Sequence, residues 1–142
     1  MSSRFTFPAA QPALRRLRAD VRSAAAKLGA TPTVCERVAL VVDELVNNAI
    51  EHGSSYRRRG LDLSVRVGVE DGRLAVEFCD PEMPEPTVRE LAAALADAGN
   101  GMPSLENERG RGLFLLSVYL EDLRAEVVAG RGMRLRGLVA RD

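Results

Sequence analysis

Residues 61–80 place the strongest local constraint on how this chain folds. In "LDLSVRVGVEDGRLAVEFCD", apolar side chains occupy alternate positions on both sides of an Asp71-Gly72 pair. Side chains of a β-strand point alternately to its two faces, and Asp-Gly is favoured in two-residue hairpin turns. The segment therefore predicts a β-hairpin with one buried face, and other parts of the chain must supply the layer that covers this face.

Two helices are predicted ahead of the hairpin and can supply that layer. The first spans residues 12–29, between a proline near its start and a glycine at its end. The second spans residues 31–53, where Thr31 or Thr33 can cap the first turn and a glycine ends the helix. Both segments carry apolar residues at helical spacing, so each has a face that must be buried.

The remaining segments complete the order β-α-α-β-β-(α)-α-β-β. They are a short strand at residues 4–9, a weak Ala-rich helix at 87–99, a loop at 100–112, a helix at 112–123 and two strands within 124–142. This order lacks the strict β-α alternation of a doubly wound fold. It predicts one domain over residues 1–142, an α+β two-layer sandwich whose mixed, mostly antiparallel sheet is covered on one face by helices.

Composition excludes several classes of function. The 20 basic and 20 acidic residues give a formal net charge of zero, which argues against non-specific binding of nucleic acid. No stretch approaches the roughly 18 apolar residues of a membrane span, and no secretory signal is visible. Cys35 and Cys79 match no metal-site or disulfide spacing. We therefore expect a cytoplasmic protein with no direct contact to nucleic acid or membrane.

The segment "VVDELVNNAIEHG" is unusually polar for the interior of a helix that has to be buried. Glu44, Asn48 and His52 lie four residues apart, so they form a narrow ridge beside the apolar stripe of the helix. Asp43 and Asn47 fall on the opposite side of the stripe, where we expect them to face solvent. Taken alone, this pattern is more typical of a polar helix flank than of a binding site.

Two features further along the chain change that interpretation. Asp80 ends a predicted strand, where a carboxylate can project into the mouth of a pocket. Gly110-Arg111-Gly112 precedes a predicted helix, and glycines at a helix start let backbone N–H groups approach a phosphate. A GxG pattern alone is typical of a simple turn. The order of these elements, from polar helix to hairpin, strand-end carboxylate and GxG, is more specific than any one of them.

In this order the chain resembles the GHKL (Bergerat-fold) ATPase superfamily, which includes histidine kinases, gyrase-type ATPases and molecular chaperones. Within it, the chain looks most similar to the small anti-sigma-factor serine/threonine kinases, the RsbW-like group. The resemblance extends from Phe5 to about Val139 and rests on "DELVNNAIEHG", a strong match, and "ERGRGLFLL", a good one. It implies a histidine-kinase-like ATPase fold that binds ATP and Mg²⁺.

The resemblance also implies roles for individual residues. Asn48 would hold the Mg²⁺ that bridges the triphosphate, Glu44 would act as general base toward a serine hydroxyl, and Asp80 would accept a hydrogen bond from the adenine amino group. His52 would orient its neighbours without taking part in catalysis, and residues 85–109 would form the ATP lid. The expected phosphate-side loop consists of Gly110, Arg111, Gly112 and Leu113.

The chain departs from the pattern of this family directly after Asp80. Where the family usually has DxGxG, this chain has "DPEMP", which places Glu82 and Pro84 at the glycine positions. Glu82 adds bulk and negative charge, and Pro84 fixes φ and removes a hydrogen-bond donor. Near the end of the chain, Gly132-Met133 stands in place of the usual Gly-Thr. We therefore expect either a different path for the lid or weak binding of ATP.

The leading functional hypothesis is a bacterial anti-sigma factor that is also a serine kinase. The resemblance implies that it phosphorylates a small antagonist protein on serine and sequesters a sigma factor. It also implies a homodimer, for which the first strand and first helix are a plausible contact surface. Two alternatives stay open: a degenerate ATPase-fold module that binds proteins with weak or no kinase activity, and a detached histidine-kinase ATPase domain that acts in trans.

Overall fold

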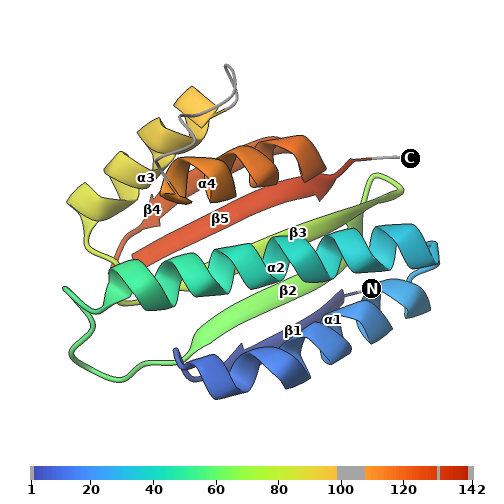
Figure 1. Cartoon of the computed structure of the whole chain (residues 1–142), viewed down its shortest axis with the longest axis horizontal. Coiled ribbons are helices and arrows are strands. Elements are labelled where there is room, and N and C mark those ends of the chain that lie inside the picture. Colours follow the sequence, from blue (N-terminus) through green and yellow to red (C-terminus); the bar gives the residue numbers. More distant parts are fainter. Residues whose placement is uncertain (1, 99–107, 131, 141–142) are drawn as a thin grey trace.

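A single antiparallel sheet and a layer of helices make up the molecule (Figure 1). The computed structural model describes residues 2–98, 108–130 and 132–140. The five strands lie in the order β1-β2-β3-β5-β4. Their bounds are β1 Ser2–Phe7, β2 Leu63–Glu70, β3 Arg73–Asp80, β4 Leu120–Val128 and β5 Gly132–Val139. The predicted α+β sandwich is confirmed, and the helices gather on one face of the sheet as expected.

Every pairing among these five strands is antiparallel, so the parallel component of the predicted mixed sheet is absent from them. The reason lies in the position of β4. This strand runs in the same direction as β3, but it occupies the edge of the sheet while β5 is inserted between the two. Along the sheet, β1, β3 and β4 run in one direction and β2 and β5 in the other, so strands of the same direction are never neighbours.

The helices follow the prediction closely at the N-terminal half of the chain. Their bounds are a 3-10 turn Gln11–Ala13, α1 Leu14–Lys27, α2 Pro32–Gly53, α3 Glu85–Ala98 and α4 Glu108–Tyr119. The side chain of Thr31 accepts a hydrogen bond from the backbone N–H of Val34 at 3.2 Å, which confirms the predicted cap of α2. The hairpin turn is also confirmed, since Asp71 and Gly72 both adopt positive φ.

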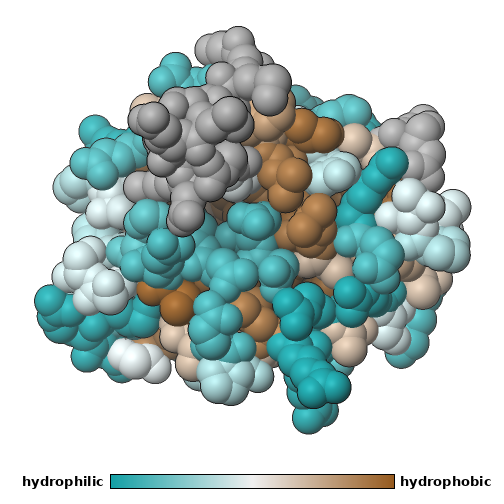
Figure 2. All heavy atoms as spheres, in the orientation of Figure 1, coloured by the Kyte–Doolittle hydropathy of each residue, from teal (hydrophilic) through white to brown (hydrophobic). Residues whose placement is uncertain are grey.

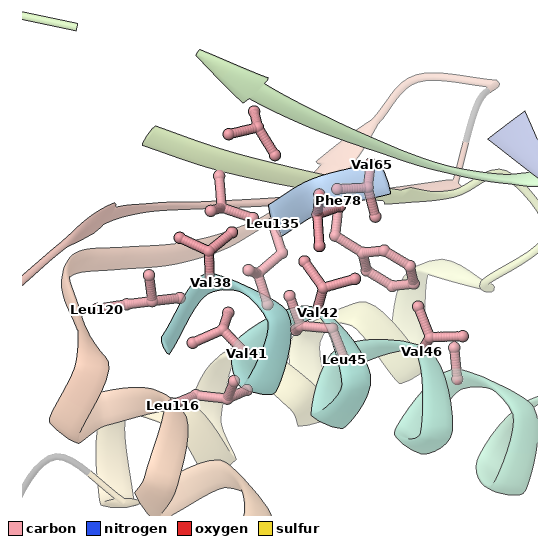
Figure 3. Packing of buried hydrophobic residues seen from close by; sticks show 14 of the residues in the cluster. Val38, Val41, Val42, Leu45, Val46, Val65, Phe78, Leu116, Leu120 and Leu135 are labelled. Carbon is pink, nitrogen blue, oxygen red and sulfur yellow. The ribbon is translucent and has the colours of Figure 1, made fainter. Parts of the chain in front are cut away.

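The core lies between the helices and the face of the sheet that they cover, and α2 supplies many of its residues (Figure 3). Val38, Val41 and Val42 of α2 are completely buried; Val38 and Val42 point toward the sheet, and Val41 lies on the side of Leu116 of α4. Leu40, which falls outside this stripe, is 38% exposed as the helical spacing predicts. The apolar stripe thus fixes the rotation of α2, and with it the direction of every polar side chain that this helix carries.

The helix predicted at residues 112–123 is wrong at both ends. It begins earlier, at Glu108, and it ends at Tyr119, so that Leu120 already belongs to β4. Leu120 is buried and pairs with β5, and an irregularity after Glu121, with Asp122 at φ +52°, lets the strand turn along the edge of the sheet. Apolar residues in this segment fit a helix and a strand equally well, and only the pairing with β5 decides between them.

The face of the molecule that carries the helices is mostly hydrophilic (Figure 2). Hydrophobic side chains gather on this face over α4, where Val118 is 51% exposed. α4 packs against α2 on one side and against α3 on the other. α3 occupies residues 85–98 of the predicted lid, and residues 99–107 of that lid lie outside the described residues.

Candidate functional site

The packing of α4 against α2 brings four of the predicted site residues together. A Cβ atom added to Gly112 would lie 2.8 Å from Oε2 of Glu44, so α4 passes directly against this carboxylate. One turn further along α2, Asn48 lines a small internal cavity together with Leu113. Glu44, Asn48, Gly112 and Leu113 therefore meet at one place, as the sequence predicts.

Glu44 and Asn48 are both without partners in the part of the chain that the structure describes. Neither side chain makes a hydrogen bond or an ion pair there. Burial, and to a smaller extent the neighbouring charge of Asp43, raise the pKa of Glu44 above its usual range. A carboxylate with a raised pKa is suited to accept a proton, and an amide oxygen is a suitable neutral ligand for Mg²⁺. Both groups are thus available for chemistry.

The start of α4 provides backbone donors beside these two side chains. Because α4 begins at Glu108, Gly110 and Arg111 lie within its first turn, where backbone N–H groups have no acceptor inside the helix. The helix dipole adds a partial positive charge at this end, which favours an anion. The GxG segment is therefore the opening turn of the helix and not a loop before it, and its use as a phosphate site stays a prediction.

Asp80 lies at the end of β3 as predicted, but its carboxylate is already fully engaged. It is completely buried. Oδ1 accepts hydrogen bonds from Nη1 of Arg57 at 3.1 Å and from the backbone N–H of Glu82 at 3.2 Å. Oδ2 accepts from the hydroxyl of Tyr56 at 2.7 Å and from Nη2 of Arg57 at 2.9 Å. A carboxylate offers about four acceptor positions, so none is left for a ligand.

Arg57 is the centre of this network. Besides its two bonds to Asp80, it donates from Nη2 to the carbonyl oxygen of Ala49 at 3.3 Å, and its Nη1 lies 3.6 Å from Glu82. The hydrogen bond to Asp80 is the main cause that raises the pKa of Arg57 further, and burial, followed by the bond to Asp80, raises the pKa of Tyr56. Both donors therefore keep their protons at neutral pH.

Glu82, expected to obstruct a nucleotide, instead binds the loop that follows α2. Its carboxylate accepts hydrogen bonds from the backbone N–H groups of Arg58, Arg59 and Leu61, and its side chain is only 3% exposed. The bond from Arg59 is the largest cause that lowers the pKa of Glu82. The sequence analysis missed this contact. The only signal for it is the pairing of a basic segment, "SSYRRRG", with the acidic "DPEMP".

The cavity beside Asn48 is almost filled by the chain itself. Met83 is 7% exposed and lines this space together with Leu113 and Leu116, and the remaining volume is about 10 Å³. Pockets for organic ligands measure about 300–1,000 Å³, and a single water needs about 10–15 Å³. Of residues 81–84, Met83 is the one that lines this space, and it stands between the two glycine positions of the usual DxGxG pattern.

Gly132 lies against the same end of β3. It adopts φ +75°, and a Cβ at this position would lie 2.2 Å from the backbone oxygen of Asp80. Only glycine permits this approach of β5 to the end of β3. Met133, which stands where the resembling family tends to have threonine, is buried and points into the same cavity.

Comparison with known families decides how this site is classified. Residues 7–136 match the Histidine kinase-like ATPase domain, which is most of the chain. The chain belongs to this family. The predicted family is therefore confirmed, and so is the fold that it implies.

Two other proteins are similar to this chain, one in sequence and one in fold. The Anti-sigma F factor of Clostridium acetobutylicum is 26% identical over 118 residues, which are 83% of this chain and 78% of that protein. A chain in the crystal structure of the SiaB-SiaC complex from Pseudomonas aeruginosa superimposes with a TM-score of 0.74 at 19% identity. That match covers 96% of this chain and 88% of the other. At this identity the second likeness concerns the fold alone.

The two ends of the ATPase-domain site differ in how well they fit ATP and Mg²⁺. At the end between α2 and α4, Glu44 and Asn48, which have no polar partner among the described residues, face the first turns of a helix, which fits a magnesium-bound triphosphate. At the other end, Asp80 has no acceptor position free for a base. Nucleotide could enter this end only after side chains of the protein move.

Three polar residues of α2 were expected to have other roles. Asp43 and Asn47 do not simply face solvent: Asp43 accepts a hydrogen bond from Arg18 of α1 at 2.9 Å, and Asn47 accepts one from Gln11 at 2.7 Å. They tie α2 to the segment before it, because α1 packs along this side of α2. The imidazole of His52 makes no hydrogen bond among the described residues, so its orienting role stays a prediction.

Among the residues that the structure describes, no helix is long and apolar enough to cross a bilayer.

Proposed function

We propose that this chain is an ATP-dependent partner-switching regulator of the anti-sigma type. It binds ATP with Mg²⁺, phosphorylates a small antagonist protein on serine, and binds a sigma factor. The proposal is supported by membership of the Histidine kinase-like ATPase domain family and by the likeness to the Anti-sigma F factor. The observation that carries it is the pair Glu44 and Asn48, which lie beside the N-terminal turns of α4 and have no polar partner in the described part of the chain.

In this proposal each group has a defined task. The amide oxygen of Asn48 would hold Mg²⁺, and the N–H groups of Gly110 and Arg111 in the first turn of α4 would bind phosphate oxygens. Bound Mg²⁺ supplies charge neutralisation on the phosphates. Glu44 accepts the proton of the serine hydroxyl as the serine oxygen forms a bond to the γ-phosphorus. The bond from the γ-phosphorus to the bridging oxygen breaks, and ADP leaves.

Calorimetric titration with ATP and Mg²⁺, followed by transfer assays with labelled ATP, tests these tasks. Asn48→Ala should abolish binding of Mg-ATP, whereas Asn47→Ala, which changes the same residue type on the other side of the helix, should retain it. Glu44→Gln should keep binding and lose transfer, with the exposed Glu51→Gln as its control. No binding to the wild-type protein at millimolar ATP, or normal transfer by Glu44→Gln, would contradict the proposal.

A second function is favoured by the saturated carboxylate of Asp80. A protein-binding module that has lost its affinity for nucleotide would have this closed base end and would not need a free Glu44. The same titration separates the two, because the module would bind a protein partner with or without ATP. Acid stability of any transferred phosphate identifies the acceptor, since phosphoserine survives acid and phosphohistidine does not. The homodimer through β1 and α1 stays a prediction, which sedimentation of the purified protein can test.

A further inference from the structure

The loop between α2 and β2 holds the end of β3 in two separate ways. Its backbone is bound by Glu82, which accepts from the N–H groups of Arg58, Arg59 and Leu61. The side chain of Arg57 reaches past these groups to the carboxylate of Asp80, where it donates from both Nη atoms. One contact therefore fixes the main chain of the loop, and the other uses only a side chain.

The carboxylate of Asp80 cannot bind this side chain and a nucleobase at the same time. Arg57 supplies two of the four hydrogen bonds that it accepts, and the others come from Tyr56 and the backbone of Glu82. A new donor must replace one of these four. Because the main-chain bond of Glu82 belongs to the turn after β3, the side-chain donors are the replaceable ones.

We propose that Arg57 determines the nucleotide affinity of this domain by competing with the base for the carboxylate of Asp80. The inference rests on the proposed function, in which Asp80 accepts a hydrogen bond from the amino group of adenine. In the structure described here, Arg57 occupies that position, and nucleotide binding requires its release.

The surroundings of Arg57 allow such a release without unfolding the loop. Its Nη1 lies 3.6 Å from the carboxylate of Glu82, and its Nη2 also donates to the carbonyl oxygen of Ala49. The guanidinium can therefore leave Asp80 and keep two of its partners. Gly53 provides the space for the side chain, since a Cβ there would lie 2.4 Å from Nη2. The loop backbone stays bound to Glu82 throughout.

Room for the base must come from side chains close to Asp80, and Met83 is a candidate, since its backbone N–H donates to the carbonyl oxygen of Asp80 at 3.4 Å. Met83 lies three residues after Asp80 and lines a space of about 10 Å³. Methionine has three rotatable bonds and no branch, so it can change its conformation at low cost. Release of Arg57 and rotation of Met83 together would open the base end of the site.

Affinity measurements on purified variants test the proposal. Arg57→Gln should lower the Kd for Mg-ATP by about tenfold or more, the scale of one charge-assisted hydrogen bond. Arg59→Gln removes the same charge two residues away from an exposed position, and its Kd should stay within about twofold of the wild-type value. Guanine carries an acceptor oxygen where adenine carries its amino donor, so the Kd for Mg-GTP should not fall in the same way.

A further variant keeps the test decisive if Arg57→Gln is poorly folded. Arg57→Lys retains the charge but not the two-pronged contact, and its affinity for ATP should lie between those of the wild type and Arg57→Gln. Circular dichroism establishes that each variant is folded. Folded variants with unchanged or weaker ATP affinity overturn the inference, and so does an equal gain for GTP, which would indicate only a larger cavity.

The pattern across proteins separates this inference from the proposed function. If the wild type binds ATP and the Arg57 variants bind no better, the competition is refuted and the proposed function stands. If only the Arg57 variants bind ATP, the competition is supported and the wild-type protein behaves as a module without nucleotide. If none of them binds at millimolar ATP, both proposals are wrong.

Discussion

Replacement of Asp80 by Asn tests the buried network with one atom changed. Each carboxylate oxygen accepts two hydrogen bonds, so an amide nitrogen in place of either oxygen loses two acceptor positions and turns a donor toward other donors. It also removes the negative charge opposite Arg57, whose side chain is only 14% exposed. A residue used only for adenine would leave the stability of the ligand-free protein unchanged.

The structure sets the size of the expected effect. Two lost hydrogen bonds to a charged group cost about 3–6 kcal/mol, and breaking a buried ion pair on one side costs about 3–5 kcal/mol. Solvent screening reduces these values little, because Asp80 is completely buried. We therefore expect Asp80→Asn to lower the free energy of unfolding by about 3–5 kcal/mol, a large part of the roughly 5–15 kcal/mol of a typical domain.

Urea unfolding followed by circular dichroism measures this loss. With a slope of about 2 kcal/mol per molar urea, the midpoint should fall by about 2 M. Asp62→Asn is the matched control, since Asp62 is exposed and makes no hydrogen bond or ion pair among the described residues. The double variant with Arg57→Gln should lose less than the sum of the single losses, because the two side chains share their bonds. An Asp80→Asn protein within about 1 kcal/mol of wild type would refute the network as a source of stability.

Three further predictions concern the same region. Gly132→Ala should lower the free energy of unfolding by well over the roughly 1–2 kcal/mol that a left-handed residue costs, because its Cβ would lie 2.2 Å from a backbone oxygen of β3. Gly130→Ala is the control: Gly130 also has positive φ but has open space around it, so urea unfolding should show only the smaller loss. Gly112→Ala should hold or raise the melting temperature, as alanine favours a helix by up to about 1 kcal/mol, while its methyl displaces the carboxylate of Glu44; phosphate transfer should therefore fall without loss of fold. The pKa of Glu82 is lowered in the folded protein. Its stabilising contribution is therefore present above the unfolded pKa of about 4.3 and is lost as pH falls through the folded pKa. Glu82→Gln should flatten the decrease in the free energy of unfolding on acidification, and an unchanged acid profile would contradict this assignment.

Much of the fold follows from short-range patterns that the sequence displays. The alternation around Asp71-Gly72 predicts the hairpin, and the threonine before α2 predicts its cap, because both effects act within a few residues. The apolar stripe of α2 predicts which side faces the sheet, and so places Glu44 and Asn48 at the border of the core. The boundary between α4 and β4 was not predictable in this way, since pairing with β5 decides it.

For the site, residue types and spacing determined the candidates, while tertiary structure decided whether each was free. Nothing near Asp80 in the sequence indicates its main partner, because Arg57 lies 23 positions earlier. The two side chains meet only when the loop between α2 and β2 packs against the end of β3. Glu44 makes no hydrogen bond within the described part of the chain for the opposite reason: the residue that α4 presents to it is a glycine. A hydrogen-bonding group can be recognised from the sequence, but whether it is free to bind a ligand depends on every chain segment that packs around it.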